Sequence, residues 1–487
     1  MIPMNLDSQS IDARQLESKL LQILPRESLI VDVETKRPFE CDGLTALAEL
    51  PMMVALPDTI EQVESILSLC SKHDVPVVPR GAGTGLSAGA MPHSQGVLLG
   101  LSKFNQIIAI DPLARSARVQ PGVTNLEISQ AAAEYGLYYA PDPSSQIACT
   151  IGGNVAENSG GVHSLKYGLT VHNVLAAELL TVDGQRLSLG SEALDSPGLD
   201  LMALICGSEG LLGVLVEVTV KLLPVPQTAR VVMAGFDRVA LAGDAVAEII
   251  SKGIIPAGLE MMDSLAIEAA ENFARAGYPS GAKALLLCEL DGTKQEVEAG
   301  IQRVTDLLLD AGATTVKASS GEDERLLLWK GRKSAFPAVG QISPDYYCMD
   351  GTIPKKHLSL VLETMAEMSE RYQLRVANVF HAGDGNLHPL ILYDANTPGE
   401  LEKAEEFGGR ILELCVEVGG CITGEHGVGI EKLKQMPSQF SDAEISQFHA
   451  VKAAFDPWST LNPGKGIPTL RQCQEYRALG AKGQRHE

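Results

Sequence analysis

The sequence predicts an α+β fold of two or three domains, and three observations lead to this class. The chain has 487 residues, more than a single core usually holds. Short apolar runs alternate with helical patterns as far as Pro226, and longer helices alternate with strands beyond it. Hydrophobic residues make up 45% of the chain, which is enough for large cores. We therefore expect a domain boundary near residue 226.

The N-terminal half contains strands and helices in irregular alternation. A helical lead-in is expected over residues 13–24. Capping boxes that begin at Thr59 and at Thr124 predict two further helices. Apolar runs bounded by turn residues predict strands over 54–56, 75–78, 96–100, 107–110, 117–119, 174–182 and 211–223.

The second half has longer helices. Helical patterns are expected over 240–252, 294–311, 357–372 and 400–419. Strands are expected over 230–234, 284–289, 376–380 and 390–392. The tail from 455 onwards carries a turn at Asn462–Lys465.

A glycine-rich stretch over residues 79–90 is the most informative segment of the chain. It follows the strand expected over 75–78, and its four glycines are Gly81, Gly83, Gly85 and Gly89. Glycine allows several backbone N–H groups to point at one ligand, which creates a nest for a phosphate. A flexible linker is the alternative, but linkers rarely lie between apolar strands. We therefore expect a phosphate-bearing ligand.

A second glycine-rich stretch, residues 151–161, suggests that this ligand is long. The first stretch lacks the lysine of a P-loop, and Leu86 replaces the last glycine of a Rossmann fingerprint. The two stretches are separated by about 70 residues. Two nests that bind one ligand from two sides predict a dinucleotide.

The composition excludes several functions. The net charge of −22 disfavours nucleic acid and anionic lipid as direct partners. No apolar run is long enough to span a bilayer, and Met1–Asp7 lacks the features of a secretory signal. The nine cysteines include no Cys-x-x-Cys pair, which favours reduced thiols in the cytoplasm and argues against an iron–sulfur cluster in this chain.

Two polar stretches in the second half predict a metal site. His381 and His388 flank the turn signal Asp384–Asn386, so a hairpin would place the two imidazoles across from each other. A later glycine-flanked stretch adds Glu425 and His426. Two histidines and one carboxylate are typical of a catalytic metal centre. The alternative is that these are ordinary polar turn residues.

Three further side chains have candidate roles. Glu425 and His426 are neighbours, so one can bind a metal while the other faces a substrate. Arg332 lies in a basic stretch of an acidic chain, and its planar guanidinium suits a carboxylate. A solvated helix face is an equally good interpretation of Arg332 and Lys333.

With these motifs together, the chain resembles the vanillyl-alcohol-oxidase/p-cresol-methylhydroxylase (VAO/PCMH) flavoproteins. Within them it is similar to the D-2-hydroxyacid dehydrogenase branch, which includes the flavin subunits of bacterial glycolate oxidases (glycolate dehydrogenases). The resemblance runs from about Pro51 to Ile467. Its motifs are residues 79–86, 151–154 with Asn158 and 160–161, 207–210, 381–388, 424–429 and 462–465.

The resemblance implies a fold in four parts. A helical lead-in over 1–50 precedes a two-part FAD-binding domain of the PCMH type over 51–226. An α/β substrate (cap) domain with an antiparallel sheet and the metal site follows over 227–455. Residues 456–487 then return to the flavin domain.

The resemblance also implies FAD as the cofactor. The expected contacts are Pro79, Arg80, Gly81, Ala82, Gly83, Thr84, Gly85, Leu86, Pro143, Ser144, Gly152, Gly153, Asn158, Gly161, Glu209 and Asn462. Some relatives attach the flavin through a histidine in the first loop. Residues 79–90 contain none, so non-covalent FAD is expected.

For the chemistry, the resemblance implies a divalent metal (Zn, Mn or Fe) on His381, His388 and Glu425. His426 would be the base, and Arg332 would grip the substrate carboxylate. Two departures concern substrate size. Relatives that act on 2-hydroxyglutarate have a lysine at the position of Cys348 and an asparagine at the position of Leu390. Their absence favours a smaller 2-hydroxy acid, glycolate or D-lactate.

The implied reaction is oxidation to the 2-oxo acid, with hydride transfer to flavin N5. Electrons would pass to FAD-type and iron–sulfur partner subunits or to quinone rather than to NAD, in the cytoplasm at the inner face of the membrane. Three alternatives stay open: an FAD-dependent, non-redox transferase of the alkylglycerone-phosphate synthase type, a D-2-hydroxyglutarate dehydrogenase, and a non-catalytic subunit.

Overall fold

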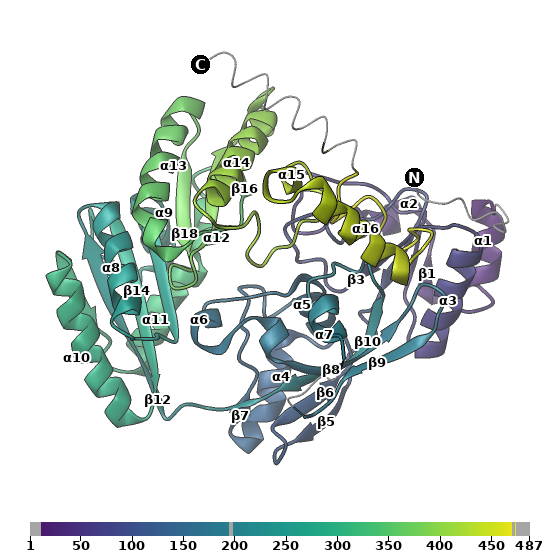
Figure 1. Cartoon of the computed structure of the whole chain (residues 1–487), viewed down its shortest axis with the longest axis horizontal. Coiled ribbons are helices and arrows are strands. Elements are labelled where there is room, and N and C mark those ends of the chain that lie inside the picture. Colours follow the sequence, from purple (N-terminus) through teal and green to yellow (C-terminus); the bar gives the residue numbers. More distant parts are fainter. Residues whose placement is uncertain (1–10, 194–197, 470–472, 474–487) are drawn as a thin grey trace. The chain divides into compact units, whose positions relative to one another are not determined.

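The computed structural model describes residues 11–193, 198–469 and 473, and these residues form two compact units (Figure 1). Unit 1 contains the described residues up to Ser159, those from Leu169 to Pro224, and those from Glu425 onwards. Unit 2 contains residues 160–168 and 225–424. Both units mix helices with sheets, which confirms the expected α+β class.

The unit limits differ from the expected domain ranges at two places. Residues 160–168, expected within the FAD-binding domain, belong to unit 2. The break after Pro224 lies next to the boundary expected at 226, but the chain re-enters unit 1 at Glu425 rather than at 456. The reason is local, because the N–H groups of Val428 and Gly429 donate to Glu209 of unit 1. The segment Met1–Asp7 and most of the expected returning tail lie outside the described residues.

Unit 1 is built on two larger sheets. The four-stranded sheet has the order β1-β2-β4-β3, in which β2, β4 and β3 are parallel and β1 is antiparallel. The five-stranded sheet, β5-β6-β10-β8-β9, is antiparallel throughout. A small pair joins β7 and β11. The bounds are β1 Leu29–Ile30, β2 Met53–Ala55, β3 Val77–Arg80, β4 Val97–Gly100, β5 Ile107–Asp111, β6 Ser116–Val119, β7 Leu137–Tyr138, β8 Val174–Leu180, β9 Arg186–Gly190, β10 Val214–Lys221 and β11 Leu223–Pro224.

Each sheet of unit 1 has its own hydrophobic core. Helix α3 (Ile60–Lys72) begins at the expected cap, where Thr59 accepts from Gln62 N, and buries Val63, Ile66, Leu67 and Cys70 against the four-stranded sheet. Helices α4 (Asn125–Ala132) and α5 (Ile151–Glu157) contribute to the core of the five-stranded sheet. The other α-helices of unit 1 are α1 Ala13–Leu20, α2 Val33–Lys36, α7 Leu201–Ile205, α15 Met436–Gln439 and α16 Asp442–Phe455.

The two glycine-rich stretches meet in unit 1. A Cβ on Gly81, directly after β3, would lie 2.2 Å from Thr150 Oγ1 and 3.7 Å from Gly153 N. Thr150 is the N-cap of α5, and its side chain accepts from Gly153 N. The second stretch therefore starts as a helix rather than as the expected loop. Glycine at position 81 allows the two segments to approach each other.

Unit 2 is organised around one antiparallel sheet of seven strands, in the order β15-β12-β14-β13-β18-β20-β16. Helix α8 packs against both α10 and α13, and α9, α11 and α12 form a second group. The strand bounds are β12 Thr228–Phe236, β13 Gly258–Asp263, β14 Ala284–Gly292, β15 Thr315–Ala318, β16 Asp345–Cys348, β17 Gly351–Thr352, β18 Val376–Phe380, β19 Asn386–Leu387 and β20 Pro389–Tyr393. The helix bounds are α6 Ser164–Tyr167, α8 Val239–Ser251, α9 Ser264–Ala274, α10 Lys294–Asp310, α11 Glu322–Lys333, α12 Ala335–Val339, α13 Leu358–Tyr372 and α14 Glu400–Glu417.

In the part of the chain that the structure describes, no helix combines the length and the apolar character that crossing a bilayer requires.

The contact between the glycine-rich stretches gives a prediction about stability. Gly81→Ala should lower the free energy of unfolding by about 2 kcal/mol, because the new methyl must displace the hydroxyl that caps α5. Gly153→Ala is the matched control. Its methyl would meet only Thr150 Oγ1, at 3.4 Å, and alanine is the better helix former by about 1 kcal/mol. Urea unfolding followed by circular dichroism measures both, and equal stability of the two variants would contradict the prediction.

Candidate functional site

The loop after β3 is held in place by hydrogen bonds that side chains donate to backbone carbonyl groups. Arg80, at the end of β3, turns its guanidinium back and donates from Nη1 to Cys41 O at 2.7 Å and to Ala90 O at 3.3 Å. Within the described part of the chain, the N–H groups of residues 82–86 donate to no acceptor. These donors are the feature that a phosphate nest requires. The residues of the first stretch therefore fit a pyrophosphate.

Two side chains from the end of the chain hold the other side of this loop. Asn462 Nδ2 donates to Gly89 O at 3.0 Å and to Glu209 O at 2.7 Å. Lys465 Nζ donates to Gly89 O at 3.0 Å and also to Met91 O. Burial lowers the pKa of Lys465 to about 8. Asn462, expected as a cofactor contact, thus holds the loop through its side chain.

The remaining expected cofactor contacts lie in helix α5 or in the segments on either side of it. Gly152 and Gly153 lie in the first turn of α5, and Asn158 ends this helix in the left-handed conformation. The side chain of Asn158 accepts from Val171 N at 2.9 Å. Pro143 and Ser144 lie in the loop before α5, and Gly161 belongs to unit 2. Of the second glycine-rich stretch, residues 151–159 therefore lie in the same unit as the first stretch, and Gly161 does not.

The segment after His426 is fixed to the same loop system. Glu209 accepts from Val428 N at 2.7 Å through Oε1 and from Gly429 N at 2.6 Å through Oε2. The N–H groups of the next two residues donate to Ser87 O, in the first glycine-rich stretch. Glu209, expected as a cofactor contact, uses its carboxylate to fix the backbone beside the candidate base.

A second buried acid, Glu157, was not identified from the sequence. Burial raises its pKa well above the ordinary value, and the charges of Glu209 and Asp42 raise it further. A Cβ on Gly427, whose φ is +79°, would lie 2.2 Å from Glu157 Oε2. Position 427 therefore requires glycine for both its backbone conformation and its space.

The two histidines of unit 2 lie on either side of the expected turn. β18 ends at Phe380, and His381 N donates to Asn386 O at 3.1 Å. The ring centroids of His381 and His388 are 5.0 Å apart with the rings nearly perpendicular, and ligand atoms of the two side chains lie within 4.8 Å of one another. His381 forms its backbone bridge with Asn386 rather than with His388. The pair can nevertheless share one metal ion.

A buried carboxylate joins this pair to Arg332. Glu260, on β13, contacts both His381 and Arg332. Its Oε1 lies 2.7 Å from His381 Nδ1, and its Oε2 lies 2.6 Å from Arg332 Nη2. Burial alone would raise the pKa of Glu260, but the charges of His381 and Arg332 hold it below the ordinary value. Arg332 is buried while Lys333 is exposed, so the solvated-face interpretation fails for Arg332.

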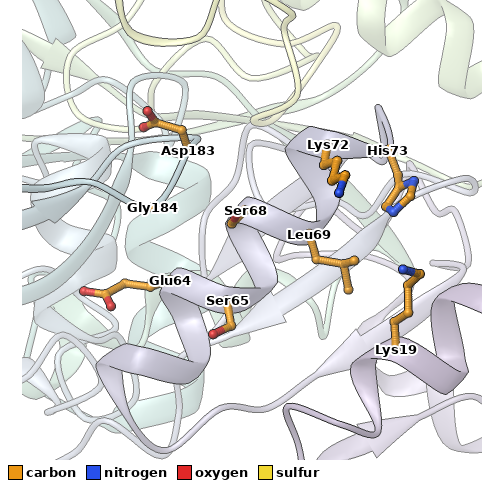
Figure 2. Close-up of a pocket in the computed structure, with 9 residues that line it drawn as sticks. All are labelled: Lys19, Glu64, Ser65, Ser68, Leu69, Lys72, His73, Asp183 and Gly184. Carbon is orange, nitrogen blue, oxygen red and sulfur yellow. The ribbon is translucent and has the colours of Figure 1, made fainter. Parts of the chain in front are cut away.

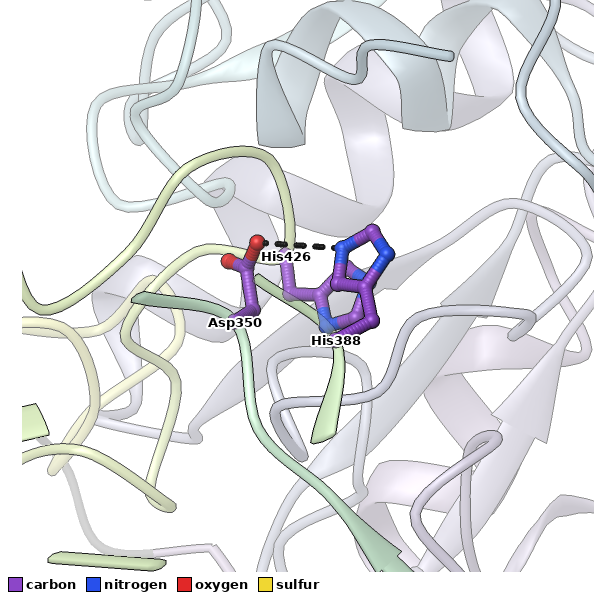
Figure 3. Close-up of side chains that lie close together, drawn as sticks. All are labelled: Asp350, His388 and His426. Atoms are coloured by element: carbon purple, nitrogen blue, oxygen red, sulfur yellow. Dashed lines mark ion pairs between the residues drawn. The ribbon is translucent and has the colours of Figure 1, made fainter. Parts of the chain in front are cut away.

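Asp350 contacts His388 and the two residues that precede Glu425. Its Oδ1 lies 3.4 Å from His388 Nε2, the ion pair drawn in Figure 3. Its Oδ2 accepts from Thr423 Oγ1 at 2.6 Å and from Gly424 N at 2.9 Å. Glu425 and His426 follow directly in the chain, as the first residues of the last segment of unit 1.

The two positions that were expected to bear on substrate size are neighbours in the sheet. Cys348 on β16 and Leu390 on β20 are direct partners in the antiparallel register, and both are buried. The sequence gives no indication that these positions, 42 residues apart, are neighbours.

A surface pocket of unit 1 contains none of these residues. It has a volume of about 500 Å³ and lies along α3, as Figure 2 shows. Its lining residues are Lys19, Glu64, Ser65, Ser68, Leu69, Lys72, His73, Asp183 and Gly184. This pocket is therefore distinct from the candidate functional site.

Comparison with protein families gives two matches that together span most of the chain. Residues 51–190 match the model of an FAD binding domain. Residues 225–466 match the model of the C-terminal domain of FAD linked oxidases. The glycine-rich stretches lie within the first match, and the histidine pair and Arg332 lie within the second.

Two curated relatives match almost end to end. The glycolate oxidase subunit GlcD of Escherichia coli K12 is 62% identical over 469 residues, which cover 96% of this chain and 94% of that protein. The D-lactate dehydrogenase of Anaerostipes hadrus is 30% identical over 461 residues, which cover 93% of this chain and 97% of that protein.

Solved structures show the same fold at low identity. A p-cresol methylhydroxylase with substrate bound matches with a TM-score of 0.78 and 18% identity, over 93% of this chain and 97% of that one. An alkyldihydroxyacetonephosphate synthase matches with a TM-score of 0.73 and 19% identity, over 96% and 87%. The VAO/PCMH-type fold expected from the sequence is thereby confirmed.

The support of the first loop gives a prediction about FAD affinity. Lys465→Met should raise the Kd for FAD by at least about tenfold, because two carbonyl groups that fix the nest lose a charged donor. The exposed Lys434, changed to Met, is the control. Fluorescence titration of the apoprotein with FAD measures both, and a Lys465→Met value within twofold of the unaltered chain would contradict the role of this lysine.

Proposed function

The chain belongs to the family of FAD-linked oxidases, and from this premise we propose that it oxidises a short 2-hydroxy acid, glycolate or D-lactate, to the 2-oxo acid. The observation that carries the proposal is the buried group of Arg332, Glu260 and His381, which combines a carboxylate-binding side chain with a metal-ligating one. The names of two relatives, a glycolate oxidase subunit and a D-lactate dehydrogenase, refer to acids of this kind.

FAD fits the nest of residues 82–86 and the adjoining start of α5. When bound, FAD takes up the electrons of the oxidation as a hydride at N5. Residues 79–90 contain no histidine, so we propose non-covalent attachment. The contribution of the chain is the rigid support of the loop by Arg80, Asn462 and Lys465.

A divalent metal, Zn, Mn or Fe, fits His381, His388 and Glu425. Two imidazoles already lie within 4.8 Å of one another at their ligand atoms. Glu425 follows directly in the chain after Gly424, whose N–H group donates to Asp350. When bound, the cation would polarise the substrate hydroxyl group.

Arg332 and His426 are the proposed substrate-handling residues. The guanidinium of Arg332 is buried, and in the described structure its Nε has no hydrogen-bond partner, so this edge can receive the substrate carboxylate. His426 is proposed to accept the hydroxyl proton, a role suited to imidazole near neutral pH. The backbone after His426 is fixed by Glu209, which keeps the base in place.

The pair Cys348 and Leu390 supports a short substrate. An additional carboxylate beside two buried side chains of this kind would lose its hydration without gaining a charged partner. The D-2-hydroxyglutarate alternative is therefore disfavoured. The transferase alternative shares the fold, but it is supported only by a structure 19% identical, whereas a glycolate oxidase subunit is 62% identical.

Electrons are proposed to leave the flavin through partner proteins. The name of the Escherichia coli relative describes a subunit, which supports an assembly with other chains. From the resemblance, we propose that these are an FAD-type and an iron–sulfur subunit that pass electrons towards quinone. Such an assembly would place this chain on the cytoplasmic side, at the inner face of the membrane. Quinone reduction by the isolated chain at the rate of the complex would contradict this part of the proposal.

The proposed substrate class is tested by turnover with an artificial electron acceptor. The FAD-loaded chain should convert glycolate to glyoxylate or D-lactate to pyruvate. For D-2-hydroxyglutarate, kcat/KM should be at least about 100-fold lower, which corresponds to about 2.7 kcal/mol of unpaired charge. Product analysis by chromatography accompanies the rates. Faster turnover of D-2-hydroxyglutarate would refute the assignment of Cys348 and Leu390 to substrate size.

The separation of roles between Glu425 and His426 gives another prediction. Glu425→Ala should weaken metal affinity by more than about tenfold, because a ligand is lost. His426→Ala should keep the metal but lose at least about 100-fold in turnover, as expected for a general base. Metal content by mass spectrometry and steady-state rates measure the two effects. Equal loss of metal in both variants would contradict the separation.

A further inference from the structure

We propose that Glu260 is a positioning residue that orients both His381 and Arg332 and thereby links metal binding to substrate binding. The inference rests on the proposed function. Glu260 lies in the middle of β13, and its side chain is 1% exposed. Each of its two oxygens contacts a different residue of the candidate site.

The position of Glu260 follows from the sheet register. Met261 on β13 pairs with Phe380 on β18, and the strands are antiparallel. The register therefore carries Glu260 to the position opposite His381. The distance between Glu260 Oε1 and His381 Nδ1, 2.7 Å, agrees with this placement.

A charged side chain at this position needs strong partners. The neighbouring residues of β13 are buried and mostly apolar, and a carboxylate in such surroundings is costly unless it is paired. Arg332 and His381 provide the pairing. Removal of one partner would leave a buried charge, so the three side chains form one unit.

For His381, the carboxylate determines which ring nitrogen can bind a metal. A carboxylate that faces Nδ1 favours the tautomer with a proton on Nδ1 and the lone pair on Nε2. Metal-binding histidines commonly have such a carboxylate on the other ring nitrogen, and its loss weakens metal affinity by about 10- to 100-fold. Glu260 thus prepares His381 to bind the metal through Nε2.

For Arg332, the same carboxylate determines the direction of the guanidinium. Its Nη2 lies 2.6 Å from Glu260 Oε2, and Nε has no hydrogen-bond partner among the described residues. A planar guanidinium fixed on one edge presents its other donors in a fixed direction. With Nη2 engaged by Glu260, the N–H of Nε is left for the substrate carboxylate.

The main test is Glu260→Gln in the FAD-loaded full-length chain. An amide is uncharged and has a single oxygen, so it cannot present an oxygen to His381 and a negative charge to Arg332. Zn²⁺ affinity, measured by competition with a chelator, should fall at least about tenfold. The affinity for glyoxylate, measured by the change in the flavin spectrum, should fall in the same variant.

Glu289→Gln is the matched control. Glu289 is also a buried acid of the unit 2 sheet, on β14, and it pairs with His163 and Arg325. It contacts none of the proposed site residues in the described structure, so both affinities should stay within twofold of the unaltered chain. Equal losses in the Glu289 and Glu260 variants, or no loss in the Glu260 variant, would overturn the inference.

A second measurement needs no variant of Glu260. Nitrogen NMR of histidine-labelled protein without metal at pH 8, with the His381 signals assigned by His381→Gln, should show Nε2 without a proton. A protonated Nε2 would overturn the inference even if Glu260→Gln does not fold. An unaltered chain that binds no Zn²⁺ would contradict the proposed metal site, whereas the NMR result tests the role of Glu260 alone.

Discussion

The arrangement of the site depends on the hydrogen bonds that fix the chain on both sides of Glu425 and His426. Before them, Asp350 accepts from Thr423 and Gly424. After them, Glu209 accepts from the next N–H groups of the backbone. Carboxylates that accept backbone N–H groups are strong anchors, since the acceptor is charged. The candidate ligand and the candidate base therefore follow residues that are fixed within unit 2 and precede residues that are fixed within unit 1.

Buried acids recur throughout the site. Glu260, Asp350, Glu157 and Glu209 are each expensive to bury. Glu260 and Asp350 contact side chains of proposed function, and Glu209 accepts from backbone N–H groups that follow the candidate base. A chain with a net charge of −22 has many acids at its surface, so composition does not distinguish these four. Their contacts do. In unit 2, buried carboxylates contact His381, Arg332 and His388, and in unit 1 a buried carboxylate fixes the backbone after His426.

The sequence predicts the elements and motifs well where the signal is local. The caps at Thr59 and Thr124, the turn between His381 and His388, and the glycine-rich stretches are all features of a few consecutive residues. Long-range pairing carries no such signal. Glu260 is separated from His381 by 121 residues, and Cys348 meets Leu390 only through the register of β16 and β20. The helix α5 was also not expected, because its glycines favour a loop until Thr150 caps it.

The most direct test of the account is single-turnover reduction of the flavin without oxygen. The FAD- and metal-loaded chain is mixed with glycolate or D-lactate, each with hydrogen or deuterium at C2. The account predicts that the visible flavin band bleaches with at least one of the two acids, and that deuterium slows the bleaching, because the C2–H bond breaks as the flavin is reduced. A flavin band that stays unchanged with both acids would contradict the account.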